Sequence, residues 1–171
     1  SVRFEGSTFN IETLRSEALL NTPSHTSSNV SRLFNNNSGR HLFSANQTEI
    51  DYLIGGGYGW VNEGISYSTP DNSTAEVYRF LVSDEGRHFY TANKNERDLI
   101  RSNLSNFIYE GIAYEVYSVD DHPADATAVV RYYNSSINSH VYSTSGYEQQ
   151  LLNQNPQWIN EGIAWYGETA I

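Results

Sequence analysis

The fold of this chain is decided by Arg87-His-Phe-Tyr-Thr-Ala-Asn93 and Tyr109-Glu-Gly-Ile-Ala-Tyr114, because versions of both stretches occur before and after them. The earlier versions are Arg40-His-Leu-Phe-Ser-Ala-Asn46 and Trp60-Val-Asn-Glu-Gly-Ile-Ser-Tyr67. The later versions are Ser139-His-Val-Tyr-Ser-Thr-Ser145 and Trp158-Ile-Asn-Glu-Gly-Ile-Ala-Trp165. The chain is therefore built from three copies of one unit, and a repeat sets the architecture before any single residue is interpreted.

An arginine, a histidine and two glutamates keep nearly constant spacing in every copy. The histidine lies nine positions after the arginine, the first glutamate eight positions further on, and the glutamate of Glu-Gly thirteen or fourteen after that. The sets are Arg32, His41, Glu49 and Glu63; Arg79, His88, Glu96 and Glu110; and Arg131, His140, Glu148 and Glu161.

Each copy is predicted to fold as a β-β-α-β unit. The arginine lies in a short apolar stretch, and an Asn- and Gly-rich turn separates it from the stretch that carries the histidine, which predicts a hairpin. Asn46, Asn93 and Ser145 each precede a glutamate by three residues, the spacing of a helix N-cap and its reciprocal acid. The alternation around Glu-Gly then predicts a third strand.

We therefore predict a β-rich α+β fold in a single domain, residues 1–171. An N-terminal extension (1–29) precedes repeats at 30–70, 77–118 and 129–167. Closure of the three units around a pseudo-threefold axis is favoured, because it hides strand edges that a short open stack would expose. In the extension, Asn10 is predicted to cap a helix over residues 11–19.

Composition excludes several classes of function. Aromatic residues make up 13% of the chain, as expected of an ordered globule, and the net charge of −10 disfavours binding to nucleic acid or to anionic membranes. The chain contains no cysteine and no methionine, which removes disulfides, thiolate catalysis and cysteine-based zinc sites. No apolar run is long enough to span a membrane. The first residue is Ser1, so we expect a piece of a longer protein. The acidic, Asn- and Ser-rich composition without Cys and Met, which is common in extracellular bacterial modules, predicts an extracellular or cell-surface location.

The repeated charged residues are interpreted as architecture, and the protein is predicted not to be an enzyme. An active site needs one asymmetric set of groups, whereas the same residues recur here three times. The first glutamate of each set is explained as a capping acid, and each histidine as a packed, hydrogen-bonded side chain. The glutamate of Glu-Gly has two interpretations: an ion pair with the arginine of its own repeat, or one ligand site per repeat beside an aromatic ring.

The candidate ligand-binding residues follow from the second interpretation. They are Trp60, Glu63, Tyr109, Glu110, Trp158 and Glu161, with Tyr58 of the Gly-rich loop at 55–59. Acidic loops follow the first two Glu-Gly strands, and calcium prefers carboxylate and carbonyl oxygens, although the spacing of an EF-hand is absent. The candidate calcium ligands are Asp71, Asp120, Asp121 and Asp125.

The motifs Gly86-Arg-His-Phe-Tyr-Thr-Ala-Asn93 and Tyr109-Glu-Gly-Ile-Ala-Tyr114 resemble a bacterial repeat that usually occurs in up to three copies and has no assigned function. The resemblance covers about residues 30–167, and the chain departs from the pattern at Ser66 and Ser139. Such repeats are found attached to secreted enzymes and to very large surface proteins, which implies an accessory binding role. In its acidity and its lack of Cys and Met, the chain also resembles ligand-binding modules of calcium-dependent RTX adhesins, some of which capture peptide termini or glycans.

These observations lead to one principal hypothesis and two alternatives. The principal hypothesis is a non-catalytic extracellular recognition module of a large bacterial adhesin, which binds a cell-surface peptide or glycan with calcium as cofactor. The first alternative is a structural spacer or self-association domain, in which Arg, His and Glu only support the scaffold. The second is an accessory domain of a secreted hydrolase.

Overall fold

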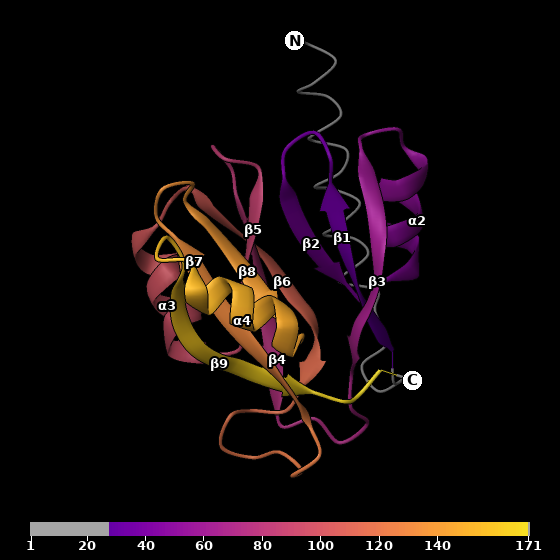
Figure 1. Ribbon diagram of the computed structural model, residues 1–171, viewed down its shortest axis with the longest axis vertical. Coiled ribbons are helices and arrows are strands. Elements are labelled where there is room, and N and C mark those ends of the chain that lie inside the picture. Colours follow the sequence, from indigo (N-terminus) through magenta and orange to yellow (C-terminus); the bar gives the residue numbers. More distant parts are fainter. Residues whose placement is uncertain (1–27, 171) are drawn as a thin grey trace.

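The computed structural model describes residues 28–170 (Figure 1). The helix expected over residues 11–19 lies outside the described residues. The described part is β-rich, with three short α-helices and three antiparallel sheets of three strands each, as an α+β fold requires. Among the described residues, no helix is long and apolar enough to cross a membrane.

The element order confirms three β-β-α-β repeats. The first repeat comprises β1 (Asn29–Asn35), β2 (Arg40–Ser44), α2 (Gln47–Gly55) and β3 (Trp60–Ser68). The second comprises β4 (Ala75–Val82), β5 (Arg87–Thr91), α3 (Lys94–Asn103) and β6 (Phe107–Val116). The third comprises β7 (Thr127–Asn134), β8 (Ser139–Ser143), α4 (Gly146–Gln154) and β9 (Ile159–Gly167).

In every sheet the arginine-bearing strand lies in the middle. The strand orders are β2-β1-β3, β5-β4-β6 and β8-β7-β9. The histidine-bearing strand therefore flanks the arginine on one side and the Glu-Gly strand flanks it on the other. This order explains why three residues that are far apart in the sequence become neighbours in the sheet.

The helices begin where the sequence predicts. Asn46, Asn93 and Ser145 are the N-caps, and their side chains accept the backbone N–H of the glutamate three residues later. The backbone N–H of each N-cap residue donates to a serine or threonine hydroxyl two residues earlier, at 3.0 to 3.3 Å. The glutamate side chains are consequently available for contacts outside their own helices.

Two bulges deform the third strand of each repeat. Opposite the arginine, the register of β4 and β6 passes from Arg79 and Gly111 to Phe80 and Tyr109, so Glu110 is an extra residue. The glycine of Glu-Gly has a φ of 97° at Gly111, a left-handed value that favours glycine. Because the same irregularity recurs in β3 and β9, the bulge turns one glutamate toward the arginine in all three repeats.

The main core lies between the three sheets, and equivalent residues from all repeats build it. Each repeat contributes a valine and two aromatic residues: Val30, Phe43 and Tyr67; Val77, Tyr90 and Tyr114; Val129, Tyr142 and Trp165. Phe43, Tyr90 and Tyr142 make edge-on ring contacts in all three pairings, with centroids 5.3 to 5.8 Å apart. The Tyr67 hydroxyl accepts the indole N–H of Trp165 at 3.2 Å and lies 2.5 Å from the Tyr114 hydroxyl.

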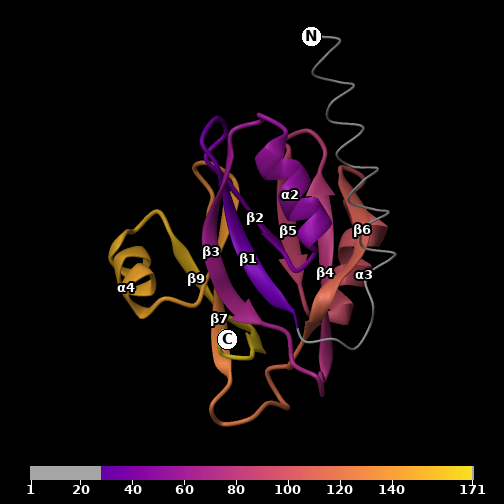
Figure 2. The same cartoon turned by 90° about the vertical axis from the view of Figure 1, so that its right-hand side faces the viewer.

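The helices lie on the outside of the molecule, away from one another (Figures 1 and 2). Separate apolar clusters join α2 and α3 to their sheets, through Leu53 and Ile100 respectively. Helix α4 has no buried residue, so it is the most weakly anchored of the three.

The first and third repeats are joined at Ser68. Its backbone pairs with Asn29 of β1 on one side. On the other side it exchanges two hydrogen bonds with Glu168, at 2.8 and 2.9 Å. The last residue of β3 is thus flanked by the start of its own repeat and by the segment that follows β9.

Candidate functional site

Each arginine pairs with the Glu-Gly glutamate of its own repeat, which is the first of the two interpretations that the sequence allows. The Nε of Arg32, Arg79 and Arg131 donates to Glu63, Glu110 and Glu161 respectively, at 2.9 to 3.1 Å. The same carboxylate oxygen lies 3.0 to 3.3 Å from the Nε2 atom of the histidine in that repeat. One bulged glutamate therefore holds the arginine and the histidine of its sheet together.

Each arginine also pairs with the capping glutamate of a different repeat, which the sequence analysis did not predict. Arg79 reaches Glu49 of the first repeat with two bonds of 2.8 Å. The remaining contacts join Arg131 to Glu96 of the second repeat and Arg32 to Glu148 of the third. The three arginines thus connect every repeat to both of the others.

The three ion-pair clusters differ in burial. The side chain of Arg79 is 1% exposed, that of Arg131 is 16% exposed and that of Arg32 is 22% exposed. Burial disfavours ionisation of Glu96, but hydrogen bonds from Arg131 and Thr91 outweigh it and lower the pKa of the carboxyl group. The cluster between the second and third repeats is therefore an ionised pair that solvent still reaches.

His140 in this cluster is a neutral hydrogen-bonding group. Burial, together with the positive charges of Arg131 and Arg87, lowers the pKa of His140 to about 3. Its Nε2 lies 3.3 Å from Glu161, a distance at which a neutral imidazole donates an N–H···O bond. The histidine positions the glutamate and carries no charge near neutral pH.

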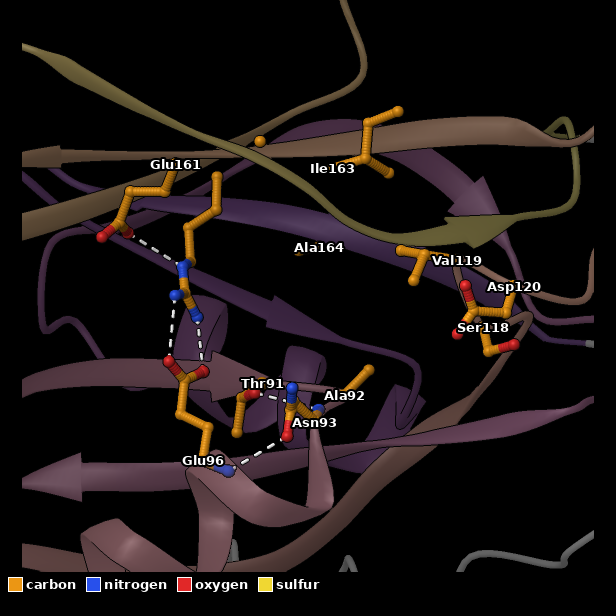
Figure 3. Close-up of a pocket in the computed structure, with 12 residues that line it drawn as sticks. Thr91, Ala92, Asn93, Glu96, Ser118, Val119, Asp120, Glu161, Ile163 and Ala164 are labelled. Carbon is orange, nitrogen blue, oxygen red and sulfur yellow. Dashed lines mark hydrogen bonds and ion pairs between the residues drawn. The ribbon is translucent and has the colours of Figure 1, made fainter.

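A cavity of about 300 Å³ opens beside the Arg131 cluster, between the second and third repeats (Figure 3). Its lining comes from the β5–α3 junction, the segment after β6, the middle of β7 and the bulged part of β9. The lining residues are Thr91, Ala92, Asn93, Glu96, Ser118, Val119, Asp120, Arg131, Glu161, Gly162, Ile163 and Ala164. Figure 3 shows Glu96 and Glu161 on one side of the cavity and Ser118 and Asp120 on the other.

The segment after β6 is held against β9, and this contact places Ser118 and Asp120 at the cavity. Tyr117 and Tyr166 exchange two backbone hydrogen bonds, at 2.8 and 3.0 Å. Further along the segment, His122 stacks on Tyr166 with ring centroids 3.6 Å apart. Between these two contacts, the Thr74 hydroxyl accepts the backbone N–H of Ser118 at 2.8 Å and donates to the carbonyl of Asp121 at 2.7 Å, which holds this stretch beside the start of β4.

The equivalent position between the third and first repeats is bridged by side chains. Ser66 and Thr144 correspond in the repeat to Ala164 and Ala92. Their hydroxyl groups lie 3.3 Å apart, and the Thr144 hydroxyl also donates to the carbonyl of Ser66 at 3.3 Å. Ala92 and Ala164 therefore line a cavity between the second and third repeats. At the equivalent place between the third and first repeats, Thr144 and Ser66 bond to each other.

Two of the four predicted ligand-binding aromatics take part in packing. Trp60 packs beside the cluster under α2. Tyr109 packs against Phe80, with the Arg101 guanidinium 4.6 Å above its ring. Tyr58 and Trp158 are half-buried, and neither lines the cavity.

The predicted carboxylates are divided between different environments. Glu161 and Asp120, from separate sequence predictions, line the same cavity, whereas Glu63 and Glu110 lie in the ion pairs of their own repeats. Asp71, Asp121 and Asp125 are exposed. Within residues 28–170 no three His, Asp or Glu side chains are grouped closely enough to hold a metal ion, so the calcium ligands remain a prediction.

Ala92, Ala164 and Ser118 are cavity residues that the sequence analysis missed. One signal was present in the aligned copies. The positions of Ala92 and Ala164 carry hydroxyl residues in other repeats, Thr144 and Ser66. Where one copy has alanine and another has serine or threonine, the contacts between repeats differ.

The fold and the site define a three-repeat α+β protein whose repeats are connected by arginine–glutamate pairs. Residues 29–168 match a family described as Domain of unknown function (DUF5648), so the chain belongs to that family. The match extends over all three repeats. Neither a curated protein nor a solved structure matches the chain significantly.

Proposed function

We propose that this domain is a non-catalytic ligand-recognition module, and that its ligand occupies the cavity between the second and third repeats. The observation that carries the proposal is the combination of a 300 Å³ cavity with four charged side chains held at its walls. This volume is at the lower end of the range for ligand pockets, about 300 to 1,000 Å³. A single amino-acid residue or a single sugar ring matches this size.

A peptide is favoured over a glycan as the ligand. Sugar binding commonly uses an aromatic ring that stacks on the sugar face. No aromatic side chain is among the residues that line the cavity, and Trp60 and Tyr109 are engaged in packing. The lining offers instead small apolar groups, hydroxyls and carboxylates, which suit a peptide side chain or terminus.

The cellular setting of the proposal rests on composition and on the resemblance to repeats of bacterial surface proteins. An acidic chain without cysteine and methionine fits an extracellular adhesin that presents this domain to a peptide on another cell. Calcium dependence belongs to the same proposal, because Asp121 and Asp125, two predicted calcium ligands of the segment after β6, are exposed.

We also infer that the repeats close around a pseudo-threefold axis. The contacts that support closure are cyclic: Arg79 pairs with the first repeat, Arg131 with the second, and Arg32 with the third. Closure would fix the relative positions of the repeats, and a site between two repeats depends on that rigidity.

The experiment transfers the polar bridge of one interface into the other. Ala92→Thr with Ala164→Ser should place hydroxyl groups across the cavity, as Thr144 and Ser66 do between the third and first repeats. The matched control is Ser66→Ala with Thr144→Ala. Both variants and the parent domain are presented to a peptide library and a glycan array, with calcium and with chelator.

The proposal expects peptide binding by the parent and the control, and loss of binding by the cavity-filling variant. Binding that survives filling of the cavity would place the site elsewhere. No binding by the parent in either screen would remove the proposal and favour a structural role, to which the buried Arg79 cluster is also suited. Deletion of the domain at constant parent length would then leave adhesion unchanged.

A further inference from the structure

We infer that the cavity between the second and third repeats selects an ammonium group, either that of a lysine side chain or that of the amino terminus of a peptide. The inference rests on the proposed function and adds the chemical class of the ligand. It follows from the charges in the cavity, from the partners those charges already have, and from the apolar residues at the cavity wall.

The cavity carries a net negative charge. Glu96, Asp120 and Glu161 supply three carboxylates, while Arg131 is its single cationic side chain. The whole chain has a net charge of −10, so the field around the domain has the same sign. The charge of the cavity and the net charge of the chain both attract a cation and repel an anion.

Arg131 is not available as an anchor for an anionic ligand. Its Nη1 and Nη2 donate to the two oxygens of Glu96, at 2.7 and 3.1 Å, and its Nε donates to Glu161 at 2.9 Å. A ligand carboxylate at this guanidinium would face both glutamates at close range. The cavity therefore disfavours peptide carboxyl termini and acidic side chains.

Two carboxylate groups retain capacity for a ligand. Asp120 has no hydrogen-bond or ion-pair partner among residues 28–170. Glu161 uses Oε1 for both Arg131 and His140, and its Oε2 has no partner in the same part of the chain. Asp120 lies on the side of the cavity away from Glu96 and Glu161 (Figure 3), where the charge of Arg131 is more distant. We assign Asp120 as the residue that pairs with the ammonium group.

The apolar lining suits the alkyl part of such a ligand. Val119 precedes Asp120 and is 46% exposed, and Ile163 on β9 is 44% exposed. Long basic side chains cover apolar surface with their methylene groups while the charge reaches a polar partner. Ala92 and Ala164 leave the space between these residues open.

The test measures the binding of matched peptides by NMR titration of the backbone amides of residues 118–120 and 162–164. The first probe is Gly-Gly-Lys-Gly-Gly with both ends blocked. Its controls carry Nε-acetyl-lysine or norleucine in place of lysine. A second probe is pentaglycine amide with a free amino terminus, compared with its acetylated form. The variants are Asp120→Asn, the matched charge control Asp121→Asn, and the cavity-filling Ala92→Thr with Ala164→Ser.

We expect the blocked lysine peptide or the free amino terminus to shift these amides, and the arm that binds identifies the source of the ammonium group. Acetylation of that amine and Asp120→Asn should each weaken binding about fivefold to tenfold, whereas Asp121→Asn should change it less than about twofold. Binding should weaken as the salt concentration rises from about 0.02 to 0.5 M.

Equal binding of the amine and its acetylated form overturns the inference. So does the absence of shifts at about 10 mM of every ammonium probe, a concentration that would reveal even a very weak site. The proposed function is tested separately from this inference. It is supported if the cavity-filling variant no longer binds a ligand found in the library or array, even a neutral one. It falls if filling the cavity leaves such a ligand bound.

Discussion

The three equivalent arginines differ in burial, so the same substitution at each of them measures how burial affects the strength of the ion pairs. Arg79→Met, Arg131→Met and Arg32→Met keep the aliphatic stem and delete the guanidinium. The arginine side chains are 1%, 16% and 22% exposed in that order. Burial sets the cost, because a carboxylate left without its partner in the interior has no water to replace the lost hydrogen bonds.

The expected magnitudes follow from this order. Arg79→Met removes the arginine partner of Glu49 and Glu110, whose side chains are each 3% exposed, so the loss in the free energy of unfolding should be about 3–5 kcal/mol. Arg32→Met breaks pairs whose partners are 29% and 34% exposed, and the loss should be about 0.2–1 kcal/mol. Arg131→Met should lie between them. For a chain of this size each kcal/mol shifts the melting temperature by about 2–4 °C, so Arg79→Met should melt roughly 6–20 °C lower.

Urea unfolding followed by tryptophan fluorescence and circular dichroism measures the three losses, with an unchanged slope as the check that unfolding stays two-state. Adding Glu49→Gln to Arg79→Met removes a buried charge that has lost its arginine, and should recover part of the loss. Equal losses at the three positions, or the largest loss for Arg32→Met, would refute the reasoning that burial governs the strength of these pairs.

Other expectations follow from the core, the buried histidine and the outer helices. Tyr90→Phe should cost about 1–3 kcal/mol in urea unfolding, because the Tyr90 hydroxyl accepts the backbone N–H of Phe43 at 2.9 Å and donates to its carbonyl at 3.1 Å; an unchanged midpoint would contradict this. The pKa of His140 falls from 6.5 to about 3 on folding, so the unfolded chain binds more protons and stability should fall as the pH drops from 6.5 toward 3. His140→Asn should make stability depend less on pH in this range. An imidazole NMR signal of His140 that titrates near pH 6 in the folded protein would contradict the lowered pKa. Leu53→Ala should cost about 2–5 kcal/mol and Leu152→Ala less than about 2, because only Leu53 is fully buried; equal losses would show that α4 is anchored as firmly as α2.

The elements of each repeat were predictable because their signals are local. The N-cap residues, the turn composition and the alternation around Glu-Gly each depend on a few adjacent positions, and the structure places helices and strands where they indicate. The pairing of Arg79 with Glu110 was one of two interpretations that the sequence offered, because both residues recur at nearly constant spacing in every copy and a guanidinium suits a carboxylate.

The contacts between repeats were not predictable in the same way. Glu49 has the spacing of a capping acid, and that local explanation hid its pairing with Arg79 of the next repeat. Sequence spacing specifies the helix start, but the direction of the carboxylate depends on how two repeats pack. The cavity shows the same limit, because Asp120 and Glu161 line one cavity only through the way the segment after β6 lies against β9.

The position of Ser68 bears on the connectivity of the chain. The backbone of Ser68 pairs with Asn29 on one side and with Glu168 on the other, so these two residues lie about two strand spacings apart, roughly 10 Å. A linker of a few residues spans that distance. A circular permutant that joins residue 168 to residue 29 and opens the exposed loop near Asp71 would keep every hydrogen-bonded sheet intact. The contacts of the fold therefore do not require that the repeat beginning at Asn29 be the first of the three in the chain.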